Sequence, residues 1–261
     1  MTRICFLNPF GTEDFDALID ETLTPSLREG THIEIRHLHA GPRNIDYYVP
    51  KHLAEVEVLR EVKRAEADGF DAFVIGCCYD PGLTQARELT DMPVVAPLEA
   101  ATSLARLFGH RFAVVTDHAK AVPELEDRIR IYGLEANCRS VRAISWFVDD
   151  MIKNPDEVAR DAYSRCREVL ERDGAEVAVL GCTIIAACYE RAVLNGVPGL
   201  TDISIVNPNV MAVKLAELLT DLRAVGQYRI SRTGYYGQHR AHDPREAEDV
   251  LGLLHGGEVR A

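Results

Sequence analysis

Two cysteines in this chain follow apolar runs that end in glycine. Cys77 comes after Val-Ile-Gly at 74–76, and Cys182 comes after Val-Leu-Gly at 179–181. A thiol at the end of a strand and the start of a helix lies near the positive end of the helix dipole, which favours the thiolate. A thiolate can act as a base or as a nucleophile. The two cysteines are therefore the first candidates for chemistry.

The spacing of the two cysteines indicates a repeat. Cys182 lies 105 positions after Cys77, and Pro198 lies 105 positions after Pro93. If two equivalent units face each other, the thiols lie on opposite faces of a planar carbanion, and one removes the proton that the other returns. Backbone N–H groups after each strand would hold the developing enolate oxygen. The alternative is that both cysteines are small core residues, because free cysteine is often buried.

The elements that must position these cysteines alternate between short apolar runs and helical stretches. Runs typical of buried strands lie at 4–7, 73–75, 112–116 and 177–180, and helical patterns lie at 52–68, 81–89, 121–132 and 156–172. This alternation predicts an α/β fold with mainly parallel sheets, in which ligands bind beyond the carboxyl ends of strands.

The repeat predicts two pseudo-symmetric, Rossmann-like lobes. We expect residues 1–104 and 205–225 to form the first lobe and residues 105–204 the second. Residues 226–261 are rich in turn-forming residues and form a C-terminal tail with no clear role.

Composition excludes several classes of function. The net charge of -12 over 261 residues opposes binding to nucleic acid or to anionic lipid. No segment has the pattern of a signal peptide or a membrane span. The seven cysteines lack the even number and spacing of a secreted disulfide framework. Reduced thiols in a cytoplasm are therefore expected.

Other candidate sites are weaker. His37 and His39 share one face of a strand, but no third ligand has the spacing to complete a metal site. The chain has no Gly-rich dinucleotide or phosphate loop and no Gly-x-Ser-x-Gly elbow. We interpret Asp80, in Asp-Pro-Gly at 80–82, as a turn-forming residue. Neither a metal nor a cofactor is expected.

The segment Cys-Cys-Tyr-Asp-Pro-Gly-Leu at 77–83 resembles the Cys-x-x-Asp-Pro-Gly-Leu segment of hydantoin racemases, in the aspartate/glutamate/hydantoin racemase superfamily. The similarity covers most of residues 3–222, including Ile-Asp at 45–46, Arg-Phe-Ala-Val-Val-Thr at 111–116 and Leu-Gly-Cys at 180–182. The resemblance implies two lobes with a cleft between them and cofactor-independent racemisation by Cys77 and Cys182. It also implies that Asn8, Thr116 and Thr183 contact the substrate.

The sequence departs from the hydantoin racemase pattern at two places. Asn-Pro-Phe-Gly at 8–11 stands where those enzymes usually have Asn-Pro-Asn-Thr, so Phe10 brings an aromatic ring to the pocket edge. Gly-Cys-Thr at 181–183 is closer to the form of amino-acid and allantoin racemases than to Gly-Cys-Ala. Phe10, Cys78 and Tyr79 complete the set of candidate substrate-binding residues.

We therefore predict a cofactor-independent racemase of a cyclic ureide, either a 5-substituted hydantoin or allantoin, that transfers protons through two cysteines. The adjacent carbonyl acidifies the C5 proton of such a ring, so a thiolate is an adequate base. A second hypothesis is a relative in which cysteine is a nucleophile or single proton donor, acting as an isomerase, decarboxylase, hydrolase or desulfhydrase. A third is a non-catalytic ligand-binding protein. The expected partners are a small-molecule substrate and further copies of the chain.

Overall fold

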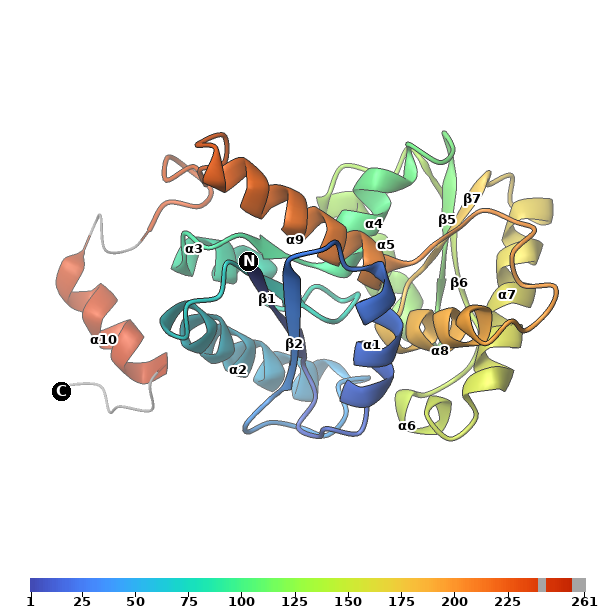
Figure 1. The fold of residues 1–261 in the computed structure, drawn as a ribbon, viewed down its shortest axis with the longest axis horizontal. Coiled ribbons are helices and arrows are strands. Elements are labelled where there is room, and N and C mark those ends of the chain that lie inside the picture. Colours follow the sequence, from blue (N-terminus) through green and yellow to red (C-terminus); the bar gives the residue numbers. More distant parts are fainter. Residues whose placement is uncertain (239–242, 255–261) are drawn as a thin grey trace.

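The computed structural model describes residues 1–238 and 243–254, which form two α/β lobes side by side (Figure 1). Each lobe contains a four-stranded parallel sheet, with strand orders β2-β1-β3-β4 and β6-β5-β7-β8. The first sheet consists of β1 (Thr2–Asn8), β2 (Thr31–His37), β3 (Ala72–Ile75) and β4 (Val94–Val95), and the second of β5 (Phe112–Thr116), β6 (Cys138–Ala143), β7 (Val177–Leu180) and β8 (Ile205–Val206). The predicted fold class is confirmed.

Strands β3 and β7 are apolar along their whole length because helices cover both faces of each sheet. Every residue of β3 and of β7 is buried. A parallel sheet needs such cover on both sides, and its strands therefore read as continuous rather than alternating apolar runs. This property made the four strands at 4–7, 73–75, 112–116 and 177–180 visible in the sequence.

The helices connect the strands and join the two lobes. They are α1 (Asp16–Leu23), α2 (Tyr48–Ala67), α3 (Leu83–Leu89), α4 (Pro97–Ala105), α5 (Ala121–Ile131), α6 (Val148–Met151), α7 (Pro155–Arg172), α8 (Thr183–Leu194), α9 (Pro208–Ala224) and α10 (Pro244–Leu254), with a 3₁₀ turn at Thr24–Ser26. Helix α9 follows β8 of the second sheet but packs on α4 and β3 of the first. Helix α1 of the first lobe packs on α8 of the second. The chain passes from the first lobe to the second between α4 and β5, and returns to the first between β8 and α9.

The strand register places the two cysteines at equivalent positions. Leu7 of β1 lies opposite Ile75 of β3, and Val115 of β5 lies opposite Leu180 of β7. Gly76, which follows β3, donates its N–H to the carbonyl oxygen of Leu7 at 2.7 Å. Gly181, which follows β7, donates to the carbonyl oxygen of Val115 at the same distance. Cys77 and Cys182 are the next residues after these glycines, so the repeat seen in the sequence is a structural one.

Helix α3 begins at Leu83, so the prediction that it begins at Pro81 is wrong. Asp80 has φ 48° and Gly82 has φ 70°, both in the left-handed region. Two left-handed residues so close together cannot continue a right-handed helix. The segment after Cys77 is consequently a tight turn.

The C-terminal tail contains one helix that the sequence analysis missed. Helix α10 lies beside α2 at the far end of the molecule, away from the second lobe (Figure 1). Residues 239–242 and 255–261 of the predicted tail lie outside the described residues. The predicted lobe boundaries stay predictions. Among residues 1–238 and 243–254, no helix is both long and apolar enough to cross a membrane.

Candidate active site

The carboxyl ends of β3 and β7 meet where the lobes face each other. The hydroxyl of Thr183 donates to the carbonyl oxygen of Gly76 at 3.1 Å, and the thiol of Cys78 donates to the carbonyl oxygen of Leu180 at 3.9 Å. Both bonds join residues of different lobes. The two Gly-Cys segments are therefore neighbours in space although they lie far apart in the chain.

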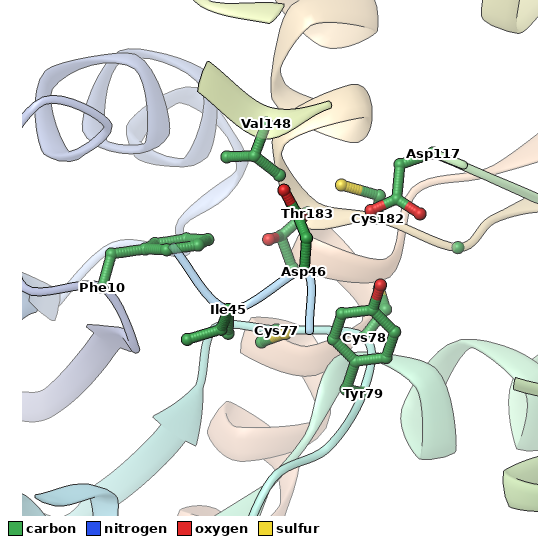
Figure 2. A pocket seen from close by; sticks show the side chains of 11 residues that line it. Phe10, Ile45, Asp46, Cys77, Cys78, Tyr79, Asp117, Val148, Cys182 and Thr183 are labelled. Atoms are coloured by element: carbon green, nitrogen blue, oxygen red, sulfur yellow. The ribbon is translucent and has the colours of Figure 1, made fainter. Parts of the chain in front are cut away.

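A small buried pocket lies at this meeting point (Figure 2). Six of the eight predicted site residues line it: Phe10, Cys77, Cys78, Tyr79, Cys182 and Thr183. Its other lining residues are Ile45, Asp46, Asp117, Val148 and Gly181. The free space is about 10 Å³, which is close to the least that one water molecule needs. A five-membered ring cannot enter this closed form, so binding such a ring requires the lobes or the loops between them to separate.

Asn8 and Thr116, the other two predicted substrate contacts, do not line the pocket. The side-chain amide of Asn8 donates to Asp16 Oδ1 at 2.6 Å. The hydroxyl of Thr116 lies 3.0 Å from Asp117 Oδ1 and 3.2 Å from the carbonyl oxygen of Gly181. Both side chains are fully buried, and in this closed form they hold the loops behind the pocket. Their predicted role in binding substrate stays a prediction.

Cys182 lies at the start of a helix, as its sequence position indicates. It is the N-cap residue of α8, so the backbone N–H groups of Ile184 and Ile185 in the first turn lie on the side of its thiol, although its side chain makes no capping hydrogen bond. Burial raises the pKa of this thiol well above 9.0, and the nearby carboxylate of Asp117 raises it further, while the two N–H groups lower it. The helix end therefore offsets part of the cost of ionising a buried thiol.

Cys77 has different surroundings, because α3 begins six residues later. Burial raises the pKa of its thiol to about 12, against the lowering effects of the backbone N–H of Tyr79 and the ammonium of Lys51. The prediction that both thiols lie at helix starts is thus right for Cys182 and wrong for Cys77. At Cys77 the positive charge comes from a lysine.

Lys51 connects the lobes beside the thiols. Its side chain is only 6% exposed, and its ammonium forms an ion pair with Glu124 of α5 in the second lobe. The same ammonium lies 3.2 Å from the centroid of the Tyr79 ring, a cation–π contact. Since Lys51 belongs to α2, this ion pair holds the closed arrangement of the pocket together.

Asp80 forms the turn after Cys77, and its carboxylate also connects three elements. It accepts the backbone N–H groups of Leu98 at 3.1 Å and Glu99 at 2.9 Å, at the start of α4. It also accepts the hydroxyl of Tyr132, from the second lobe, at 2.5 Å. Helix α4 has no side-chain cap of its own, so Asp80 supplies the missing acceptor. The carboxylate is fully buried.

We expect Asp80 to make folding stability depend on pH. Burial raises the pKa of Asp80 from 3.8 to about 7, although its hydrogen bonds from Tyr132, Glu99 and Leu98 lower it. The folded state therefore binds this proton more tightly than the unfolded chain. The resulting stabilisation is complete below pH 3.8 and is lost as the pH rises through 7.

Urea denaturation of the wild type and of Asp80→Asn, repeated at several pH values, measures this contribution. The unfolding free energy of the wild type should fall relative to that of the variant, with a slope of up to about 1.4 kcal/mol per pH unit within that window. A difference between the two proteins that is constant across the window would contradict the expectation.

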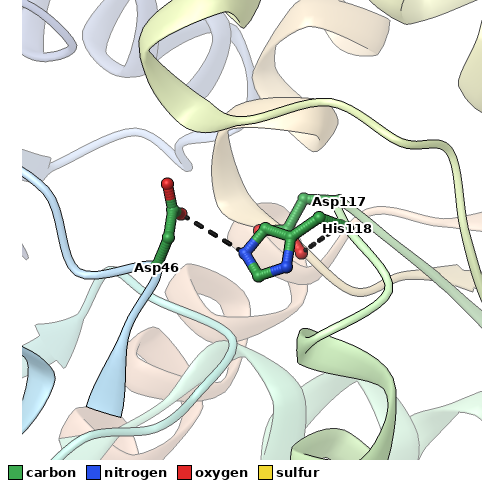
Figure 3. A group of neighbouring side chains, drawn as sticks. All are labelled: Asp46, Asp117 and His118. Atoms are coloured by element: carbon green, nitrogen blue, oxygen red, sulfur yellow. Dashed lines mark hydrogen bonds and ion pairs between the residues drawn. The ribbon is translucent and has the colours of Figure 1, made fainter.

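The sequence analysis missed a buried polar cluster beside the thiols (Figure 3). Asp46 reaches into the site from the loop between β2 and α2, and Asp117 and His118 follow β5 in the other lobe. The potential ligand atoms of the three lie within 4.8 Å of one another, so two carboxylates and an imidazole could hold a divalent cation. Burial lowers the pKa of His118, but the two carboxylates raise it by more.

Two signals in the sequence could have found this cluster. Asp46 belongs to the Ile-Asp pair at 45–46 that carries part of the resemblance, and Asp117 and His118 directly follow Thr116 at the end of a predicted strand. Polar residues just after a buried parallel strand lie at the edge where ligands bind. Nothing in the sequence, however, indicates that Asp46 and His118 approach each other.

The structure therefore defines an α/β protein with two parallel-sheet lobes, in which one thiol from each lobe lines a shared pocket. Comparison with known proteins agrees with this structure. The sequence profile of the Asp/Glu/hydantoin racemase family matches residues 4–216. The chain belongs to this family of racemases, which are isomerases.

Relatives of the chain are found among sequences and among solved structures. It is 32% identical to the hydantoin racemase of Rhizobium meliloti over 217 residues, which are 83% of this chain and 88% of that protein. The allantoin racemase of Klebsiella pneumoniae superposes with a TM-score of 0.81 and 26% identity, covering 91% of this chain and 94% of that one. The allantoin racemase of Pseudomonas fluorescens gives a TM-score of 0.80 and 28% identity over 92% and 97% of the two chains.

Proposed function

We propose that this protein racemises an uncharged cyclic ureide, a 5-substituted hydantoin or allantoin, by proton transfer between C5 of the ring and the thiols of Cys77 and Cys182. The observation that carries the proposal is that the two cysteines, from equivalent strand ends of two lobes, line one buried pocket. The relatives that bear the names hydantoin racemase and allantoin racemase support this class of substrate.

The reaction needs a base on one face of the ring and an acid on the other. The thiolate of one cysteine removes the C5 proton, and the electron pair of the broken C–H bond moves toward the neighbouring carbonyl to form an enolate. The thiol of the other cysteine then delivers its proton to the opposite face of C5, which inverts the stereocentre. The roles exchange when the other enantiomer is the substrate, so no cofactor is required.

The surroundings of the two thiols are consistent with their exchanging the roles of base and acid. The N–H groups of Ile184 and Ile185 favour the thiolate form of Cys182, and the ammonium of Lys51 favours that of Cys77. Burial opposes ionisation of both, so a lone thiolate is a strong base once it forms. A strong base is what a weakly acidic C–H bond requires. Backbone N–H groups of the loops after β3 and β7 are the donors we assign to the enolate oxygen.

Polarimetry combined with mass spectrometry tests the proposed class of reaction. An enantiomerically pure 5-substituted hydantoin, or pure allantoin, should lose its optical rotation in the presence of the protein while its mass stays unchanged. A change in mass would indicate the second hypothesis, in which a cysteine supports hydrolysis, decarboxylation or loss of sulfide. Binding without any change of rotation or mass would indicate a ligand-binding protein and would contradict the proposal.

A further inference from the structure

Asp46, which lines the pocket, and its neighbour His118, which lies behind the lining, have buried polar atoms without hydrogen bonds. Asp46 is 2% exposed and His118 is 3% exposed. Asp46 Oδ2 and both ring nitrogens of His118 have no hydrogen-bond partner among the described residues. Asp46 Oδ1 and His118 Nε2 are 3.6 Å apart, which is an ion-pair distance but too long for a hydrogen bond. Leaving buried polar groups without hydrogen bonds is costly, so these atoms indicate a ligand that forms the missing hydrogen bonds.

Asp117 adds a second acceptor from the opposite lobe. Its Oδ1 accepts the backbone N–H of His118 at 2.8 Å and lies 3.0 Å from the hydroxyl of Thr116. No hydrogen bond reaches its Oδ2 from the part of the chain that the structure describes. Asp46 and Asp117 both line the pocket of the thiols, one from each lobe (Figure 2). The pocket therefore presents two carboxylate acceptors next to Cys77 and Cys182.

The charge of the pocket restricts what can bind there. None of its lining residues is a lysine or an arginine. The nearby ammonium of Lys51 is already paired with Glu124. A substrate with its own carboxylate would meet two like charges at close range, which is unfavourable in a desolvated site. An uncharged ring that carries N–H groups would instead donate a hydrogen bond to each carboxylate.

We propose that Asp46 and Asp117 each accept one ring N–H of the cyclic ureide, and that they thereby exclude substrates that carry a carboxylate. The inference rests on the proposed function and names the groups that select its substrate. The two N–H groups of such a ring lie on either side of the C2 carbonyl, so one carboxylate cannot accept both. Two carboxylates from opposite lobes can, once the lobes separate to admit the ring, because in the closed form an oxygen of each lies within 4.8 Å of the other.

His118 is a positioning residue in this arrangement. Its ring stacks on Phe147 with 4.9 Å between the ring centroids and an angle of 23° between the planes. This stacking fixes the imidazole. The ring lies beside Asp46 (Figure 3). The imidazole limits the orientations open to the Asp46 carboxylate and, when protonated, offsets part of the negative charge that burial makes unfavourable.

Binding titrations by calorimetry test the inference without relying on turnover. The ligands are a 5-substituted hydantoin, its two ring N-methyl derivatives, and the corresponding N-carbamoyl amino acid, which is the ring-opened form with a carboxylate. Wild-type protein should bind the hydantoin at least ~10²-fold more tightly than either methylated ring or the ring-opened acid, because a site built to accept an N–H leaves its acceptor unpaired when that donor is blocked.

Asp46→Asn and Asp117→Asn are the informative variants. Each removes one negative charge, and asparagine keeps a carbonyl oxygen that can accept the existing hydrogen bonds of Asp117. Each variant should bind the ring-opened acid about tenfold more tightly than wild type does, because a like charge is gone. Each should also reduce the penalty for methylation of one ring nitrogen and not the other. Asp127→Asn, at an exposed position on α5, is the charge-matched control and should change neither value.

Several results would overturn the inference. One is equal binding of the ring-opened acid to wild type and both variants. Another is loss of ring binding on treatment with a chelator and its recovery with a divalent cation, since the cluster would then be a metal site.

A wild type that binds the hydantoin with this selectivity but does not racemise it would refute the proposed function and leave the inference standing. Thermal unfolding checks that each variant is folded, and either variant alone suffices for the test.

Discussion

Cys182→Ala should lower the rate of racemisation of a cyclic ureide by roughly 10³-fold or more, and Cys77→Ala should do the same. The two losses should be similar, because inversion needs a proton acceptor on one face of the ring and a donor on the other. Each cysteine serves in both directions of the reaction. Polarimetry with each pure enantiomer measures the effect directly.

Cys188→Ala is the matched control for these variants. Cys188 is 1% exposed and lies on α8, the helix that Cys182 caps, but it does not line the pocket. Its replacement should keep most of the activity. Cys78→Ala distinguishes the roles of the two adjacent thiols, because Cys78 donates to the carbonyl of Leu180 and has no assigned proton-transfer role. This variant should lose much less of the racemisation rate than Cys77→Ala. A Cys77→Ala protein that keeps a tenth of the wild-type rate would contradict the mechanism.

Gly76→Ala should destabilise the fold by about 3 kcal/mol and remove most of the activity. A Cβ at this position would lie 2.3 Å from Cε1 of Phe6 and 2.7 Å from the backbone oxygen of Leu7. Phe6 is fully buried and Leu7 belongs to the neighbouring strand, so neither atom can move without disturbing the sheet. The added methyl group must therefore push the end of β3 outward, and Cys77 with it.

Urea denaturation and racemisation assays together measure this effect. Gly252→Ala provides the comparison, because Gly252 is in helix α10 and a Cβ there, apart from the helix's own backbone, meets no atom of residues 1–238 and 243–254 within 4 Å. Its replacement should stabilise the helix by about 0.5–1 kcal/mol and leave the rate unchanged. An unfolding free energy for Gly76→Ala within about 0.5 kcal/mol of wild type would show that the strand ends have more freedom than the contacts indicate.

The sequence was informative about the sheets because the physics there is local. A strand that is covered on both faces must be apolar along its whole length, and β3 and β7 can be recognised by that property alone. The equal spacing of the Gly-Cys pairs then predicted that Cys77 and Cys182 occupy equivalent strand ends, and the register confirms this. Both conclusions depend on short segments read one at a time.

The parts of the site that escaped prediction depend on contacts between lobes. Asp46 and His118 approach each other only because two loops from different lobes meet, and no local pattern encodes that meeting. The late start of α3 follows from the left-handed backbone at Asp80, whose carboxylate is held by α4 and by Tyr132. Asp-Pro-Gly is compatible with either a turn or a helix start, and here the distant partners decide the outcome.

The central claim is that protons reach opposite faces of one carbon from two different thiols. The most direct test is early racemisation of a pure enantiomer in heavy water, with deuterium at C5 measured separately in the substrate and product enantiomers. Two separate thiols predict deuterium in nearly every product molecule and almost none in the remaining substrate. Equal early labelling of both enantiomers would show that one group serves both faces, and would contradict the assignment of Cys77 and Cys182 as a pair.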